Sequence, residues 1–287
     1  MKIAISGSGG FIGTHILKAF SDDADNDIRL LKWRGDRWEL STEDGKTAPI
    51  LSSSEIDVDV VILLGASMPK DRSEVNDFTS AVSNINSSSE FTKLPFLRSL
   101  RILFFSTIDV YSFDNLVSES TDPQPASLYG HAKLFCEMLL REFAEQNGHE
   151  LSVLRVGHVF GPGENEATKV VPRMLKDSKD LGVIRVFGEG DERRSFLFVR
   201  DLVSMVQELI HQREIPSLIN LVGSESRSIA ELAKLVASIS RNETKIIRTR
   251  AAERPTDQEF DKALMHKVFS KPQTSLAQGL REELDSL

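Results

Sequence analysis

A tyrosine and a lysine stand four residues apart in the middle of the chain, at Tyr129 and Lys133. On a helix this spacing brings both side chains to one face. A phenol has an unperturbed pKa of about 10, and a nearby ammonium lowers that pKa by stabilising the phenolate. The pair could therefore exchange a proton with a carbonyl or alcohol oxygen while hydride arrives or leaves. The same spacing also arises by coincidence on amphipathic helices.

A threonine about 22 residues before the tyrosine strengthens the catalytic interpretation. Thr107 ends an apolar run that is predicted to be a buried strand. Open α/β sheets bind their ligands at the carboxyl ends of such strands. The Thr107 hydroxyl could hydrogen-bond the reacting oxygen and hold it for Tyr129.

Three glycines near the first residue, Gly7, Gly10 and Gly13, predict a dinucleotide site. They follow an apolar run and precede a segment with helical periodicity, where the chain must turn sharply and approach a pyrophosphate with bare backbone. Phe11 and Ile12 open the helix, whose N-terminus favours an anion. Glycines can also serve turn geometry alone. The strand before them and the helix after them favour the cofactor site.

Strands that alternate with helices must position these residues. Apolar runs of strand length occupy residues 28–31, 58–64, 101–105 and 151–156, and helical patterns occupy residues 11–20, 75–91 and 129–147. This alternation predicts an α/β fold, a Rossmann-type doubly wound parallel sheet. The Asp44–Gly45 pair has the chemistry of a tight turn, so residues 37–49 are predicted to form a small ribbon.

The alternation of strand and helix patterns becomes less regular after residue 163. A helix is expected at residues 171–179, a strand at 183–187 and a helix at 228–240. We expect residues 1–162 to form a dinucleotide-binding Rossmann domain, with residues 196–222 returning to it. Residues 163–195 and 223–287 are then a smaller C-terminal α/β substrate-binding region.

Composition excludes several classes of function. The chain has 287 residues and a net charge of −8, which argues against a nucleic acid or an anionic membrane as partner. Its single cysteine, Cys136, excludes an intrachain disulfide and is expected to be a buried apolar residue. No segment approaches the roughly 18 apolar residues of a membrane span, and no metal-binding motif is present. We expect a soluble, cytoplasmic protein without a metal.

The end of the second predicted strand bears on the choice of cofactor. NAD-binding folds usually place an acidic residue there, whereas basic residues accommodate the 2′-phosphate of NADP. Lys32 and Arg34 are basic, although a solvated loop is an alternative explanation of their charge. The pattern favours NADP as NADPH, with NAD as the alternative.

The chain resembles the extended short-chain dehydrogenase/reductase family, in the NAD-dependent epimerase/dehydratase branch that acts on nucleotide sugars. The matching segments are residues 7–13, 59–66, 106–111, 129–133, 155–163, 188–196, 199–201, 220–223, 254–257 and 275–280. The resemblance implies that Thr107 and Tyr129 act on the substrate oxygen. It implies that Lys133 lowers the tyrosine pKa and holds the nicotinamide ribose, and that Ala66 lies at the cofactor.

The resemblance also assigns substrate-binding residues. Arg194 and Arg254 match arginines that grip the diphosphate of a nucleotide sugar, although both could be solvated surface residues. His158 stands where many relatives have asparagine, so it is either a substrate contact or a structural histidine. Asn84 aligns with an asparagine near the cofactor. A homodimer is implied, formed by the helix of Tyr129 and the helix that precedes the strand of Thr107.

Departures from the family pattern narrow the chemistry. Dehydratases carry an Asp-Glu pair directly after the threonine, whereas this chain has Ile108 and Asp109. Without a carboxyl at residue 108, elimination of water is disfavoured. Branches of the family that epimerise the carbon next to a keto group commonly use a cysteine at the position of Asp109. They pair this cysteine with a His or Lys farther along the chain, and Lys169 could be that residue. That activity is a minor alternative.

The sequence therefore predicts an NAD(P)-dependent oxidoreductase that acts on a nucleotide-linked sugar. The simplest activity is reduction of a 4-keto sugar. A nucleotide-sugar 4-epimerase with NAD would use the same residues twice and is the first alternative. The second alternative is a non-catalytic dinucleotide-sensing protein. Such a protein would be expected to lose the tyrosine or the lysine, and this chain retains both Tyr129 and Lys133.

Overall fold

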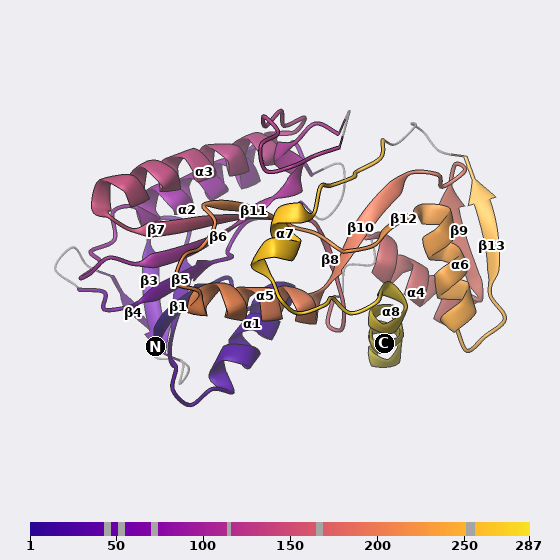
Figure 1. The fold of residues 1–287 in the computed structure, drawn as a ribbon, viewed down its shortest axis with the longest axis horizontal. Helices are drawn as coiled ribbons and strands as arrows, with labels where there is room; N and C mark the ends of the chain where they lie inside the picture. The colour runs from indigo at the N-terminus through magenta and orange to yellow at the C-terminus, as the bar shows by residue number, and fades with distance from the viewer. Residues whose placement is uncertain (43–46, 51–54, 70–73, 114–115, 165–168, 251–255) are drawn as a thin grey trace. The chain divides into compact units, whose positions relative to one another are not determined.

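The computed structural model describes residues 1–42, 47–50, 55–69, 74–113, 116–164, 169–250 and 256–287 (Figure 1). The chain forms two compact units. The first unit comprises Met1–Tyr111, Asp122–Val156 and Val206–Ile219. The second comprises Ser112–Thr121, Gly157–Met205 and Asn220–Leu287.

An eight-stranded sheet forms the centre of the first unit. Its strands, in spatial order, are β11 (Leu218–Leu221), β7 (Glu150–Val156), β6 (Arg101–Thr107), β5 (Val60–Leu63), β1 (Lys2–Ser6), β2 (Asp27–Trp33), β3 (Trp38–Thr42) and β4 (Thr47–Pro49). The five strands from β7 to β2 are mutually parallel, and β3 and β4 form an antiparallel ribbon against β2. The predicted parallel sheet and ribbon are both confirmed. Asp44 and Gly45 of the predicted turn lie outside the described residues.

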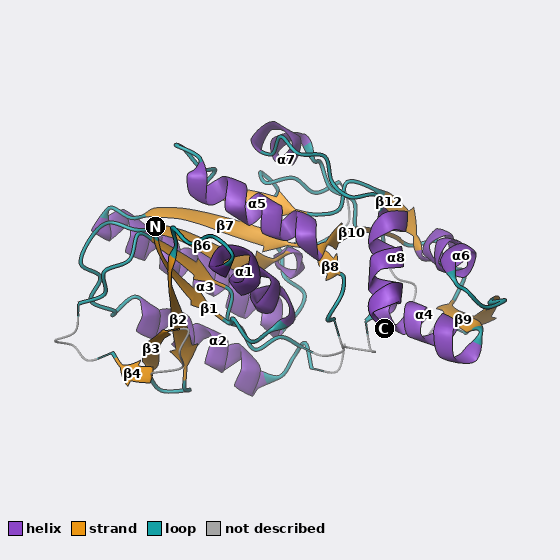
Figure 2. Cartoon of the chain, turned by 90° about the horizontal axis from the view of Figure 1, so that it is seen from below, coloured by secondary structure: helices purple, strands orange, loops and turns teal. Residues whose placement is uncertain are grey.

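Helices cover both faces of this sheet. They are α1 (Phe11–Ser21), α2 (Phe78–Phe91), α3 (Leu128–Asn147) and the later part of α5 (Val199–His211), with a short 3₁₀ helix, η1 (Ile108–Val110). Figures 1 and 2 show α2 and α3 over one face and α1 over the other. This arrangement confirms the predicted doubly wound fold. Within the described ranges, no helix has the length and apolar character needed to cross a membrane.

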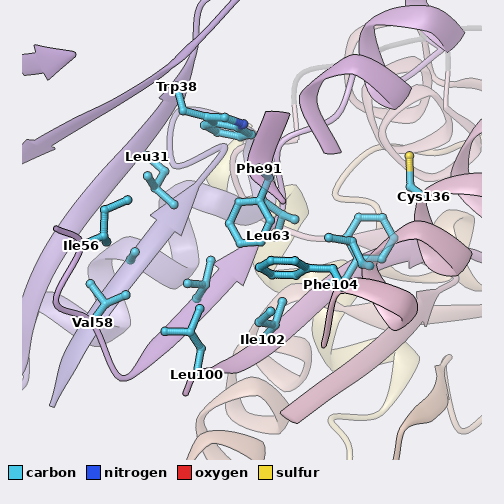
Figure 3. Close-up of a cluster of buried hydrophobic side chains, with 14 of the residues drawn as sticks. Leu31, Trp38, Ile56, Val58, Leu63, Phe91, Leu100, Ile102, Phe104 and Cys136 are labelled. Atoms are coloured by element: carbon cyan, nitrogen blue, oxygen red, sulfur yellow. The ribbon is translucent and has the colours of Figure 1, made fainter. Parts of the chain in front are cut away.

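The core of the first unit lies between the sheet and the helices α2 and α3. Figure 3 shows its buried side chains, among them Trp38, Phe91 and Phe104. Burying one side chain of this size contributes about 1.5–3 kcal/mol. Cys136 is buried in the same cluster, as predicted. The Trp38 Nε1–H also donates to the carbonyl oxygen of Ser87 at 2.9 Å, which ties the ribbon to α2.

Within the part of the chain that the structure describes, the second unit contains two small sheets and four further helices. One sheet joins β12 (Ser226–Ser228), β10 (Arg193–Phe198) and β8 (His158–Phe160), and the other joins β13 (Lys245–Thr249) and β9 (Val183–Phe187). The helices are α4 (Val170–Leu181), α6 (Ile229–Ile239), α7 (Ala263–Val268) and α8 (Leu276–Ser286). The helices and the strand predicted at residues 171–179, 228–240 and 183–187 are therefore present.

The compact units divide the chain at different residues from the predicted domains. Residues 157–162 belong to the second unit because β8 pairs with β10 and not with the large sheet. Residues 112–121 also belong there, since Val117 forms a β-bridge with Phe260. Residues 196–222 are predicted to return to the Rossmann domain, and residues 206–219 of this segment lie in the first unit.

A buried carboxyl group in the second unit makes stability depend on pH. Glu283, on α8, is only 1% exposed. Burial and the charge of Glu164 raise the pKa of its carboxyl to about 8, against the opposing effect of the Gly161 backbone N–H. In the unfolded chain the Glu283 carboxyl would ionise near its ordinary pKa, so the folded state disfavours the ionised form of this group. This contribution to stability is fully present below about pH 4 and is lost as pH rises toward about 8.

The substitution Glu283→Gln tests this origin of the pH dependence. Because glutamine has no proton to lose, we expect the variant to gain about 2 kcal/mol or more over the parent at about pH 9, and much less at about pH 5. Unfolding by urea at both pH values measures the difference. Asp285→Asn, an exposed change on the same helix, is the control. An equal effect of Glu283→Gln at both pH values would contradict the assignment.

Candidate active site

The glycine turn forms where β1 meets α1, and backbone approaches backbone closely there. A Cβ on Gly13 would lie 2.0 Å from the carbonyl oxygen of Gly7, so the helix could not start in this position with any other residue. A Cβ on Gly7 would lie 2.8 Å from the backbone nitrogen of Gly65, at the end of β5. Both glycines are therefore required by the protein's own packing.

Gly10 differs from the other two glycines. Its added Cβ would meet nothing closer than the Gly7 oxygen, at 3.5 Å, and its φ of −82° suits any residue. It is the N-cap of α1 and makes no side-chain cap, so the first N–H groups of Phe11 and Ile12 are available to an anion. Because the fold does not require glycine here, the bare backbone fits the close approach of a dinucleotide pyrophosphate.

Ala66 follows β5 beside this turn. The next residue, Ser67, is held by both ends of the Asn84 amide, which accepts from the Ser67 N–H at 2.7 Å and donates to its carbonyl oxygen at 3.0 Å. Asn84 is buried and its side chain is committed to this backbone. It therefore positions the segment of Ala66, and whether Ala66 touches a cofactor stays a prediction.

Thr107 ends β6, as predicted, and is buried. Its hydroxyl accepts from the backbone N–H of Asp109 at 3.1 Å and lies 3.2 Å from the Asp109 carboxylate oxygen. Glycine at position 130 lets α3 approach this segment, because a Cβ there would lie 2.4 Å from the Asp109 carbonyl oxygen. The threonine, the aspartate and the start of α3 are thus brought together.

Tyr129 lies in the first turn of α3 and is 6% exposed. Burial is the main cause that raises the pKa of its phenol, and the negative charge of Asp109 raises it further. A hydrogen bond with the Thr107 side chain acts in the opposite direction. The structure therefore joins the two predicted hydroxyls and keeps the Tyr129 phenol protonated at neutral pH.

Lys133 lies one turn further along α3 and is 2% exposed. Its ammonium donates to the carbonyl oxygen of Phe105 at 2.6 Å and lies 4.3 Å from the centre of the Phe104 ring. Burial lowers the pKa of Lys133 to about 8, while Cys136 and Glu137 act to raise it. The predicted effect of Lys133 on the tyrosine pKa and its contact with a ribose stay predictions.

A buried ionic network lies beneath these residues, and the sequence analysis missed it. Arg155, on β7, makes a bidentate contact with Glu137, through Nε at 3.1 Å and Nη2 at 2.7 Å. The Ser106 hydroxyl donates to the same carboxylate, and the Arg155 guanidinium lies 4.7 Å from the centre of the Tyr111 ring. The signal in the sequence was a glutamate four residues after the lysine, on the same helix face.

The basic residues at the end of β2 have an acidic neighbour. Arg34 Nε donates to Glu39 Oε2 at 2.8 Å, and Lys32 stands opposite Glu39 in the pairing of β2 with β3. The sequence could not show this, because the register of the ribbon places Glu39 there. Lys32 and Arg34 therefore lie at a strand end that carries both signs of charge.

The predicted substrate residues of the second unit are held by neighbouring backbone and side chains. His158 Nε2 donates to Gln258 Oε1 at 2.7 Å, and its ring lies 5.9 Å from that of Phe196. Arg194 NH1 donates to the carbonyl oxygens of Arg193 at 2.7 Å and Thr256 at 2.6 Å. Arg254 lies outside the described residues.

Lys169, the suggested partner of Asp109 in epimerisation, forms an ion pair in the second unit. Its ammonium lies 2.6 Å from Glu164 Oε1, at the N-terminus of α4. Among the described residues, no group of three or more His, Cys, Asp or Glu side chains is arranged to hold a metal ion.

Comparison with known families identifies the class of protein. The model of the NAD dependent epimerase/dehydratase family matches residues 3–221. The chain therefore belongs to this family, which confirms the resemblance and the interpretation of the chain as an enzyme of the extended short-chain dehydrogenase/reductase type.

Individual relatives differ in how much of the chain they match. The Bacillus subtilis protein described as uncharacterized UDP-glucose epimerase YtcB is 27% identical over 313 residues, which cover 99% of this chain and 97% of that protein. UDP-glucuronic acid decarboxylase 5 of Arabidopsis thaliana is 26% identical over 265 residues, 83% of this chain and 74% of its own. The dTDP-4-dehydro-6-deoxy-D-allose reductase of Streptomyces bikiniensis is 34% identical, but over only 39% of this chain and 35% of its own.

Solved structures share the fold. The UDP-glucuronic acid 4-epimerase of Bacillus cereus, solved in complex with NAD, is 21% identical with a TM-score of 0.79 and covers 100% of this chain and 98% of its own. The RMD protein of Pseudomonas aeruginosa, complexed with NADPH, is 21% identical with a TM-score of 0.78 and covers 99% of this chain and 98% of its own. The predicted Rossmann-type fold is thereby confirmed.

The contrast between Gly10 and Gly13 gives a test of the cofactor site. Gly10→Ala should leave the free energy of unfolding within about 1 kcal/mol of the parent, because the added methyl makes only an ordinary van der Waals contact, with the Gly7 oxygen at 3.5 Å. The same change should weaken dinucleotide binding about tenfold or more. Gly13→Ala should destabilise the fold by about 3 kcal/mol or more through its backbone clash. Urea unfolding and equilibrium titration with NADPH and NADH measure both effects. Full dinucleotide affinity in Gly10→Ala would exclude this turn as the pyrophosphate site.

Proposed function

We propose that this chain is an NAD(P)-dependent oxidoreductase that acts on a nucleotide-linked sugar, and that its reaction is reduction of a 4-keto sugar. The observation that carries the proposal is the hydrogen bond between the Thr107 and Tyr129 side chains, where β6 ends and α3 begins, with Lys133 one helical turn further along α3. All three side chains are buried at the edge of the sheet where the glycine turn also lies.

The residues of the chain account for the proton chemistry of such a reduction. A bound nicotinamide dinucleotide would supply the hydride. The Thr107 hydroxyl would hold the substrate oxygen, and the protonated phenol of Tyr129 would donate its proton to that oxygen as negative charge develops there. The Lys133 ammonium would stabilise the resulting phenolate.

The carboxylate of Asp109 helps to keep the Tyr129 phenol in its protonated form, as a reductase needs before hydride arrives. Its negative charge raises the pKa of Tyr129, so it disfavours the phenolate that would accept a proton from an alcohol. A proton donor is the form needed when hydride arrives at a ketone. The same electrostatic effect makes the return of the proton to Tyr129 favourable after each turnover.

NADPH is the proposed cofactor, with NAD as the alternative. Lys32 and Arg34 stand at the end of β2, where a 2′-phosphate would need positive charge. NADPH that exchanges at every turnover also suits net reduction. For the substrate, Arg194 and Arg254 would bind the diphosphate, and His158 would contact the sugar or remain structural.

A nucleotide-sugar 4-epimerase is the second candidate. The observation that favours it is the full-length similarity to the Bacillus subtilis protein described as a UDP-glucose epimerase, since the reductase relative matches only 39% of the chain. An epimerase would retain NAD and use Thr107, Tyr129 and Lys133 in both directions.

We further propose that the protein is a cytoplasmic homodimer. Phe135 and Met138 lie three residues apart on α3 and are 49% and 59% exposed, and Phe78 at the start of α2 is 72% exposed. Exposed apolar side chains gathered on two packed helices are typical of an interface between copies. The single cysteine is buried and free, which fits a reducing compartment.

Incubation with dTDP- or UDP-linked 4-keto sugars and NADPH tests the reaction. We expect one NADPH consumed for each sugar reduced, and Tyr129→Phe should lower the turnover at least about 100-fold because the proton donor is lost. Tyr111→Phe is the matched control, since the chain has only two tyrosines. Conversion between sugar isomers without net use of cofactor would contradict the reductase and establish the epimerase. Activity unchanged in Tyr129→Phe would contradict both.

A further inference from the structure

The second unit contains a cavity of about 260 Å³ whose lining includes none of the candidate catalytic, cofactor or substrate residues. It is bounded by α5, by α7 and by the segment that joins α7 to α8 (Figure 1). Met205, Met265 and Phe269 give it an apolar lining, and all three are buried. Sites for drug-sized ligands have volumes of about 300–1,000 Å³, so this cavity has room for a smaller molecule.

Hydrogen bonds fix the wall of the cavity on two sides. The side chain of Gln273 accepts from the Ser224 N–H at 2.7 Å and donates to the carbonyl oxygen of Val222 at 3.0 Å. The neighbouring Thr274 donates to the Asp201 carboxylate on α5 through its N–H at 2.9 Å and its hydroxyl at 2.8 Å. The segment before α8 is therefore held in place without a ligand, and a preformed site loses less entropy when it binds one.

The opening of the cavity is basic. His266 and Lys271 line the cavity and are exposed, so they lie at its opening. Residues 262–271 contain three lysines and a histidine but no acidic residue, in a chain whose net charge is −8. An ammonium has three donors, and the described contact of Lys271, with the Ser204 hydroxyl at 3.3 Å, uses one of them. The opening therefore offers positive charge and further donors to an anion.

Lys271 is better placed than Lys262 to supply that charge. Lys262 donates to the carbonyl oxygen of Ser224 at 2.8 Å, and the nearby carboxylates of Glu259 and Glu225 compensate its charge. Within the described ranges Lys271 has no ion pair, so its charge remains for a ligand.

The lining favours an aromatic body for such an anion. Met205 and Met265 bring two polarizable thioether sulfurs, which make favourable contacts with aromatic rings, and Phe269 can pack against a second ring edge to face. A carboxylate matches the ammonium of Lys271 in charge. A phosphate dianion would bring negative charge in excess of that one lysine beside an apolar lining, which is unfavourable.

We propose that this cavity is a binding site for a small aromatic carboxylate. The ring contacts Met205, Met265 and Phe269, and the carboxylate pairs with Lys271 at the opening. The site lies outside the proposed catalytic residues, so it goes beyond the proposed function and does not depend on it.

Titration with 4-fluorophenylacetate, followed by fluorine NMR, tests the site on the whole protein. We expect saturable binding with a Kd of about 1 mM or tighter, and binding at least about tenfold weaker for the neutral 4-fluorophenylacetamide. Lys271→Gln should weaken the carboxylate about tenfold and leave the amide nearly unchanged. Ser224→Phe adds a side chain at an exposed position of the lining and should abolish binding of both probes.

Two further variants serve as controls. Lys267→Gln removes the same charge from α7 at an exposed residue outside the lining, so it should change the affinity for the carboxylate less than about twofold. Arg194→Gln alters the proposed substrate site and should also leave this affinity unchanged. Thermal unfolding monitors the fold of every variant.

Three results would overturn the inference. The first is the absence of saturable binding of 4-fluorophenylacetate to the wild-type protein. The second is an affinity that Lys271→Gln changes no more than Lys267→Gln does, or that Ser224→Phe leaves intact. The third is loss of binding in Arg194→Gln, which would assign the probe to the substrate site. Each result leaves the proposed reaction untouched, because turnover of sugar and NADPH tests that separately.

Discussion

The ion pair of Glu137 and Arg155 connects the elements that carry the candidate catalytic residues. Both side chains are almost fully buried, and the Ser106 hydroxyl shares the carboxylate. Removal of one partner from such a pair typically costs about 3–5 kcal/mol, because the other charge is left buried alone. The network joins α3, which bears Tyr129 and Lys133, to β6 and β7. The position of Thr107 relative to Tyr129 therefore depends on it.

This arrangement also explains how a lysine can be kept inside the protein. Lys133 lies among aromatic and apolar groups, and burial lowers its pKa to about 8. Glu137, one helical turn away, acts in the opposite direction and helps to keep the ammonium charged. The carboxylate that helps to keep Lys133 charged is itself paired with Arg155.

Much of the fold was predictable because its signals are local. Buried parallel strands appear as short apolar runs, and the glycine turn and the Tyr129–Lys133 spacing each depend on a few consecutive residues. Thr107 could be placed at the same edge of the sheet as the glycine turn because parallel strands end at a common edge. These predictions needed no knowledge of how distant segments pair.

What the sequence did not show depends on pairing between segments far apart in the chain. Glu39 became a neighbour of Arg34 only through the register of the ribbon. The hydrogen bonds between the Asn84 amide and the backbone of Ser67 also depend on how separate segments pack. The pairing of β8 with β10 likewise joins segments that are more than 30 residues apart in the chain. Such contacts follow from three-dimensional packing, for which the chain carries no short pattern.

The central claim is that hydride and the phenolic proton of Tyr129 reach the same carbonyl group. Reaction of a 4-keto sugar nucleotide with NADPH deuterated on the transferred face of its nicotinamide tests it most directly. Mass spectrometry and NMR should find one deuterium on the sugar carbon that was the ketone. A reduced sugar that carries no deuterium at that carbon with either face of the nicotinamide labelled would contradict the account.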